Sequence, residues 1–74
     1  MNRIKLQGIY ELKEAKFVKD LVVGDVITWN YGYQSEVIEI IRSKTDKTFT
    51  IILKSLNDGM IRNRRMKAAT LVAV

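Results

Sequence analysis

The chain has 74 residues, 47% hydrophobic and 28% charged, and its 13 Lys and Arg against 8 Asp and Glu give a net charge of +5. This composition is that of one globular domain and excludes a disordered chain. The sequence contains no Cys and no His, which excludes disulfides, thiolate zinc sites and catalysis by a Cys or His side chain.

The N-terminal half and the C-terminal half differ in charge. Residues 1–39 hold five basic and six acidic side chains, whereas residues 40–74 hold eight basic and two acidic ones. The positive charge of the C-terminal half either attracts an anionic partner or keeps the protein soluble and prevents pairing between strand edges. No apolar run approaches the ~18 residues that span a bilayer, and residues 1–5 lack the apolar core of a signal peptide. We therefore expect a cytoplasmic protein with no membrane partner.

The first 20 residues carry two competing patterns. Alternating apolar side chains at Ile4, Leu6, Tyr10 and Leu12 predict a strand over residues 3–10. Residues 10–16 are also rich in good helix formers, so a helix remains open there. We expect the apolar side chains at 17 and 18 to pack on the core before the chain turns at residues 20–21.

From residue 20 onward, short β-branched and aromatic segments alternate with turn residues, which is typical of an all-β chain. Strands are predicted over residues 26–29, 36–42 and 49–54, with loops over 30–34 and 43–47. In the third strand, Phe49, Ile51 and Leu53 share one face.

The C-terminal segments begin with a hairpin signal. Asn57-Asp58-Gly59 predicts a type I′ turn, because Asp-Gly readily takes the positive φ angles that this turn needs. Residues 60–66 are predicted to form the returning strand, residues 67–70 one helical turn, and residues 71–74 a last strand. The fold class is therefore all-β, a small SH3-like five-stranded barrel, because closure removes exposed strand edges. The domain spans 1–74, with 1–17 as an N-terminal strand extension and 18–74 as the barrel; an OB-like barrel, or a β-meander completed by a second subunit, is the alternative.

Residues 18–74 resemble a set of small, mostly uncharacterised proteins encoded by phages and prophages. The resemblance rests on an entry turn, an aromatic element, an Arg-Arg strand and an apolar end, here Asp20–Ile27, Trp29–Tyr33, Arg64-Arg65 and Leu71–Val74. It implies an SH3-like barrel of phage-derived origin. It implies no activity and no site residues.

The acidic residues offer no catalytic or metal-binding arrangement. Glu36 and Glu39 are three apart, which places them on opposite faces of a regular strand. The acidic residues 20, 25, 46 and 58 lie in turns, where carboxylates bond to backbone N–H groups. We therefore expect no enzyme activity, no metal and no cofactor. A barrel of this size should also leave little room for a closed pocket, since ligand pockets typically measure ~300–1,000 Å³.

The aromatic element at residues 29–33 is the first candidate site. On an extended chain Trp29, Tyr31 and Tyr33 project to one side, where their rings can stack bases or dock a peptide. The alternative is that Trp29 fills the core and the two tyrosines cover its open end.

The basic strand is the second candidate site. Arg62 and Arg64 share a face, and we expect them to reach solvent if Ile61 points inward. Lys54 would then lie beside them across the hairpin, with Lys67 and Arg42 extending the patch. Guanidinium groups suit phosphate because their donors form a planar fork. The alternative is a solvated face that pairs with Glu36 or Glu39.

Together these features predict a non-enzymatic module that binds nucleic acid through a basic strand and an aromatic loop. The predicted site comprises Trp29, Tyr31, Tyr33, Lys54, Arg62, Arg64 and Lys67. The alternative partner is a host protein, contacted through the two tyrosines and the Met60 and Met66 face. A third use of residues 1–12 is to form a homo-oligomer through the N-terminal strand.

Overall fold

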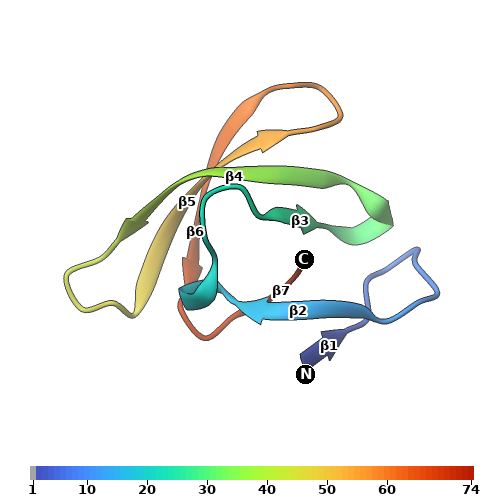
Figure 1. The fold of residues 1–74 in the computed structure, drawn as a ribbon, viewed down its shortest axis with the longest axis horizontal. Coiled ribbons are helices and arrows are strands. Elements are labelled where there is room, and N and C mark those ends of the chain that lie inside the picture. The colour runs from blue at the N-terminus through green and yellow to red at the C-terminus, as the bar shows by residue number, and fades with distance from the viewer. Residues whose placement is uncertain (1) are drawn as a thin grey trace.

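The computed structural model describes residues 2–74, which form one antiparallel sheet of seven strands in the order β1-β2-β7-β3-β4-β5-β6 (Figure 1). The strands are β1 (Asn2–Ile4), β2 (Lys13–Phe17), β3 (Val26–Thr28), β4 (Gln34–Arg42), β5 (Thr48–Ser55), β6 (Ile61–Lys67) and β7 (Leu71–Ala73), with 3₁₀ turns η1 (Val18–Asp20) and η2 (Asn30–Gly32) between them. The all-β prediction is confirmed, and so are the five strands predicted after residue 20. Within residues 2–74, no helix has the length and apolar character to cross a membrane.

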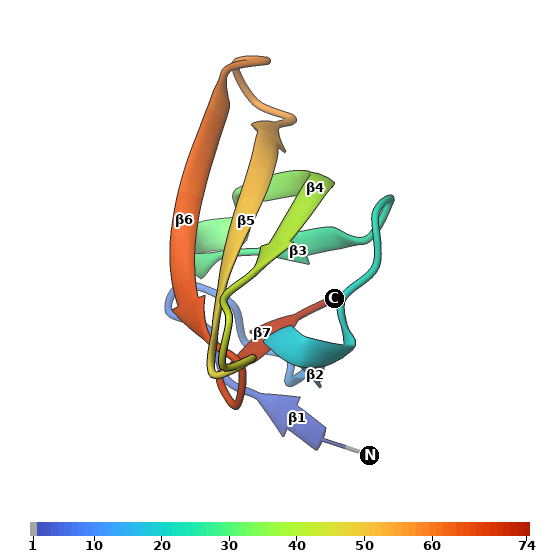
Figure 2. The ribbon, with the colours of Figure 1, turned by 90° about the vertical axis from the view of Figure 1, so that its left-hand side faces the viewer.

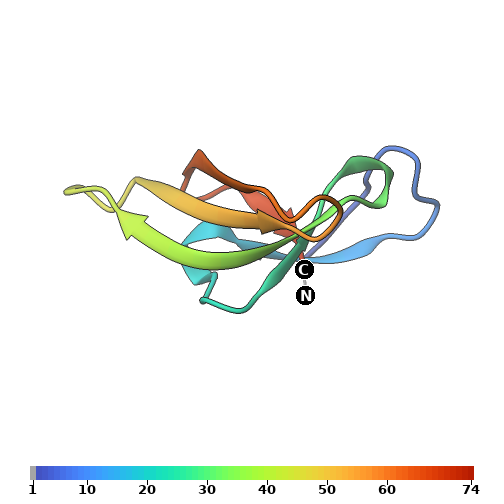
Figure 3. The same cartoon turned by 90° about the horizontal axis from the view of Figure 1, so that it is seen from above.

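The sheet is not closed into a barrel. β1 and β6 stand at its two ends, and within residues 2–74 each pairs with one neighbour, β2 and β5 respectively. Figure 2 shows β6 at the edge of a three-stranded meander with β5 and β4 beside it. The two connections of this meander lie at its opposite ends (Figures 1 and 3). The structure therefore keeps two open edges where a closed barrel would have none.

One core joins both halves of the sheet, and β5 supplies its centre. The predicted alternation is confirmed, because Phe49, Ile51 and Leu53 are buried while Lys54 is exposed. The buried cluster comprises Val18, Leu21, Ile27, Val37, Phe49, Ile51, Leu53 and Val72. The prediction that Val18 packs on the core is also confirmed, since this side chain is fully buried.

The predicted strand over residues 3–10 is wrong beyond Ile4. The chain turns at Gly8, which has a φ of +76°, and returns as β2. β2 lies between β1 and β7, with Ala15 opposite both Asn2 and Ala73. Pairing on both sides outweighs the helix propensity of this segment, which amounts to a few tenths of a kcal/mol per residue. Residues 13–17, predicted as part of an extension, are thus an interior strand of the sheet.

A β-bulge in β4 overturns the prediction that Glu36 and Glu39 face opposite sides. Glu36 pairs with Lys54 and Glu39 pairs with Ile52, and the register shifts between Val37 and Glu39. The extra residue reverses the alternation of the strand. Both carboxylates therefore lie on the outer face of the sheet, and Val37 stays in the core.

The hairpin between β5 and β6 is longer than the predicted two-residue type I′ turn. Gly59 has a φ of +72°, but the φ of Asp58 is not positive. A type I′ turn needs positive φ at both residues, so this turn is of another kind. The backbone N–H of Gly59 instead donates to the Ser55 carbonyl at 2.8 Å. Likewise, residues 67–70 form a hydrogen-bonded turn, Thr70 N to Lys67 O at 3.0 Å, rather than a turn of helix.

Core packing around β5 gives the first testable prediction. Ile51→Val removes one methylene from a fully buried side chain, and we expect it to lower the free energy of unfolding by about 0.5–1.5 kcal/mol. The matched control is Ile61→Val on the neighbouring strand, where the side chain is 62% exposed; its effect should stay within about 0.5 kcal/mol. Denaturant unfolding measures both, and equal effects would contradict the inward orientation of Ile51.

Candidate nucleic-acid interface

The register between β5 and β6 decides which basic side chains face the inside of the sheet. Arg62 pairs with Leu53 and Arg64 pairs with Ile51. Cross-strand partners project to the same face, so both arginines lie on the side of the buried core.

The residues of β6 that alternate with these arginines, at odd-numbered positions, project to the opposite, outer face of the sheet. Ile61 pairs with Lys54 and is 62% exposed, so the condition that it points inward is not met, yet Arg62 and Arg64 are exposed. Lys54 is therefore on the outer face, away from the two arginines. Lys67, paired with Thr48, has the same outer parity at the far end of β6.

Arg62 and Arg64 line an open groove of about 470 Å³, together with Trp29 and Tyr33. This volume lies within the range of ligand sites, but the groove is open, so the expectation of little room for a closed pocket is not contradicted. The rest of the lining is mostly polar and comprises Gln34, Ser35, Leu53, Ser55, Asn57, Asp58 and Asn63. Sequence reasoning did not assign these seven residues to a site. For Ser35, the sequence held a signal of an inward position, because Ser35 precedes the apolar Val37 by two residues and alternate residues of a strand share a face. In the structure Ser35 is 8% exposed.

Arg64 stacks on Trp29 inside this groove. The guanidinium carbon lies 4.7 Å from the centroid of the indole ring, in cation–π range. The indole Nε1–H donates a hydrogen bond to Ser35 Oγ at 3.1 Å, which orients the ring. Trp29 is partly buried and packs against the core. It therefore forms part of the core and also a wall of the groove.

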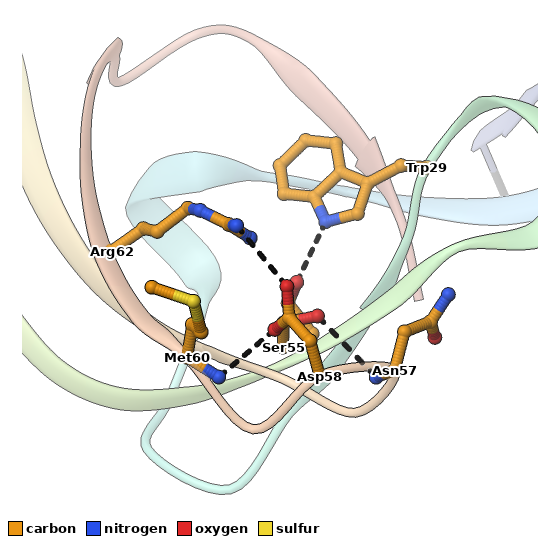
Figure 4. A network of polar contacts seen from close by, with 7 residues as sticks. Trp29, Ser55, Asn57, Asp58, Met60 and Arg62 are labelled. Carbon is orange, nitrogen blue, oxygen red and sulfur yellow. Dashed lines mark hydrogen bonds and ion pairs between the residues drawn. The ribbon is translucent and has the colours of Figure 1, made fainter.

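Arg62 is held by the hairpin loop rather than by an aromatic ring. Its Nη2 lies 3.2 Å from Asp58 Oδ2, and Asp58 Oδ1 accepts the backbone N–H of Met60 at 2.9 Å. Figure 4 shows Arg62 reaching across to Asp58, with the Trp29 indole nitrogen directed toward the same group of side chains. The Met60 N–H is the main cause that lowers the pKa of Asp58, and Ser55 and Arg62 add to it.

Tyr31 does not share a face with Trp29 and Tyr33, contrary to the prediction. The segment is not extended, because η2 places Tyr31 at a φ of +64°. The Tyr31 hydroxyl and backbone N–H both donate to Gln7, at 3.2 and 2.7 Å. Its ring lies so close to Gly8 that a Cβ there would come within 2.5 Å. Tyr31 thus links η2 to the turn at residues 7–8. Tyr33, which is 57% exposed, lines the groove instead.

Of the predicted site, the groove brings together Trp29, Tyr33, Arg62 and Arg64, and it leaves Tyr31, Lys54 and Lys67 outside. Arg42, predicted to extend the patch, lies over the Phe49 ring at 5.7 Å. Within residues 2–74 no group of three acidic side chains is placed to hold a metal ion. No protein family, no curated protein sequence and no solved structure was found to match this chain. The resemblance to phage-encoded proteins stays a prediction.

The lowered pKa of Asp58 predicts a specific pH dependence. A carboxyl group whose folded pKa lies below its ordinary 3.8 stabilises the fold above that value, and this stabilisation is lost as the pH falls through the folded pKa. The stability difference between the wild type and Asp58→Asn should therefore be largest above pH 3.8 and shrink below it.

An NMR titration of the Asp58 carboxyl carbon measures the folded pKa directly. Arg62→Ala should leave the midpoint below 3.8, because the Met60 N–H is the larger cause. A midpoint at or above 3.8 in the wild type would contradict the hydrogen bonding described for the loop.

Proposed function

We propose that the groove binds single-stranded nucleic acid, with Arg64 contacting a phosphate. The observation that carries this proposal is the stack of Arg64 on Trp29 in the wall of the groove. Aromatic rings beside guanidinium groups in an open groove are the arrangement by which single strands are bound. A net charge of +5 favours a polyanionic partner.

Arg64 is oriented before any ligand arrives. Its guanidinium carbon lies over the indole ring, 4.7 Å from the centroid, where the cation–π attraction holds the group at the wall of the groove. The hydrogen bond from Trp29 to Ser35 fixes the ring in turn. Within residues 2–74, no ion pair engages Arg64, whereas Arg62 is paired with Asp58. A phosphate therefore meets no internal competitor at Arg64.

Base contacts would come from the remaining wall of the groove. The exposed Tyr33 ring offers a stacking surface. The hydroxyl of Ser55 and the amide of Asn57 supply donors and acceptors that can reach a base edge. Bases of a single strand present those edges, because they are not paired.

The SH3-like barrel and the phage-derived origin belong to the same proposal. The bent, seven-stranded sheet around one core supports a barrel that is left unclosed between β6 and β1. The groove would then be a consequence of the missing closure.

A host-protein partner is the second candidate function. Residues 61–65 of β6 are all exposed. The edge of β6 that faces away from β5 pairs with no other strand within residues 2–74. Extended peptides add to strand edges of this kind through backbone hydrogen bonds.

A salt-dependent titration distinguishes these candidates. We expect an oligothymidylate of about ten nucleotides to quench the fluorescence of Trp29, the one tryptophan in the chain. The phosphate contact at Arg64 gives a slope of about −0.7 in log affinity against log salt, which is an about 2.6-fold loss between about 50 and about 200 mM salt. Arg64→Ala should weaken binding and reduce the magnitude of the slope by about 0.7.

Arg65→Ala is the matched control. It removes the same charge from the adjacent residue of β6, whose parity places it on the outer face opposite Thr50. Its affinity should stay close to that of the wild type. Equal losses in the two variants would reduce the interaction to general charge attraction. No binding at low salt would eliminate the proposal and leave the edge of β6 as the candidate interface.

A further inference from the structure

A second hollow lies on the other side of the stacked pair of Trp29 and Arg64. Its volume is about 350 Å³, and both of these residues line it as well as the groove. The rest of its lining is mostly apolar and includes Ile4, Leu6, Met66 and Leu71. The polar groove and this apolar hollow therefore share one wall.

The order of residues along β6 places the two spaces in line. Arg62 lines the groove, Arg64 lines both spaces, and Met66 lines the apolar hollow. Alternate residues of a strand share a face, so these three side chains form one inward-facing row. At about 3.3 Å per residue, the row from Arg62 to Met66 is about 13 Å long. Ile4 of the end strand β1 lines the same hollow as Met66 of the opposite end strand.

We propose that the two spaces hold two successive nucleotides of one strand, with their linking phosphate at Arg64. This inference rests on the proposed function and specifies its ligand as an unstacked dinucleotide step. One base enters the polar groove beside Tyr33, and the other enters the apolar hollow beside Met66.

The place of Arg64 between the two spaces favours this occupant. A dinucleotide joins two bases by one charged link, and the row on β6 sets the guanidinium group of Arg64 between the two spaces. Among the residues that line the hollow, Arg64 is the one with a charged side chain. A base in the hollow would cover apolar surface at the open seam between β1 and β6, which is favourable in water.

The spacing also excludes a duplex as the preferred ligand. Successive bases in a duplex are stacked about 3.4 Å apart along the helix axis. Two bases placed on either side of Arg64 must instead be splayed apart, which an unpaired strand allows. A duplex of the same sequence should therefore bind more weakly than the single strand at equal salt.

Amide NMR titrations with two small probes test the inference. The probes are thymidine 5′-monophosphate and the 5′-phosphorylated thymidine dinucleotide, at about 50 mM salt. The mononucleotide should shift the amides of the polar groove, such as Asn57 and Asn63. The dinucleotide should shift these and also Met66 and Leu71, and it should bind more tightly.

A dinucleotide analogue that lacks one base leaves the protein unchanged and so avoids any problem of folding. Losing a base that stacks or is buried should weaken binding about five-fold or more. On the protein side, Ile4→Gln makes one wall of the apolar hollow polar. It should weaken binding of the dinucleotide and leave that of the mononucleotide unchanged, so the mononucleotide controls for folding.

The outcomes separate the two proposals. If the dinucleotide and the mononucleotide bind equally and shift the same amides, the apolar hollow holds no base and this inference is overturned, while the proposed function stands. The same conclusion follows if removing either base has no effect, or if the duplex binds as tightly as the single strand. If neither probe nor a longer oligothymidylate shifts any amide, the proposed function itself fails.

Discussion

The pairing register between β5 and β6 is the constraint on which the candidate site depends. Because Phe49, Ile51 and Leu53 must be buried, their partners on β6 are forced to the same side of the sheet. Two of those partners are Arg62 and Arg64. A shift of one residue would turn the arginines outward and bring Asn63, with either Ile61 or Arg65, into their place. The burial of three apolar side chains thus orients the basic groups of the groove.

The sequence predicted local structure well where apolar alternation was strong and failed where distant segments decide the outcome. The alternation in β5 and the turns rich in polar residues located the strands after residue 20. The first 17 residues were misjudged, because β2 is defined by its two neighbours rather than by its own propensity. Of the site, the sequence pointed to Trp29, Tyr33, Arg62 and Arg64. It could not show that Tyr31 turns away, since that depends on a contact with Gly8.

The same lack of closure that makes the fold differ from the predicted barrel leaves the groove and the hollow open. A closed barrel would join the strands at its two edges and fill the space between them with side chains. Here the seam is lined instead by Ile4 on one side and by Arg64 and Met66 on the other. Trp29 anchors to the core at the bottom of this seam and supports the guanidinium group above it. The core and the wall of the groove therefore share a single indole ring.

The single extra residue in β4 also gives the molecule two electrically different sides. By reversing the alternation, the bulge sends Glu36 and Glu39 to the outer face, where Lys54 and Arg65 also lie. With Lys67, which also lies on the outer face, these groups sum to a charge of +1. On the inner face of β4 to β6, Arg42, Arg62 and Arg64 together with Asp58 of the hairpin sum to +2. Without the bulge, Glu39 would lie on the inner face and Arg42 on the outer one, so the extra residue makes the face that holds the groove the more positive of the two.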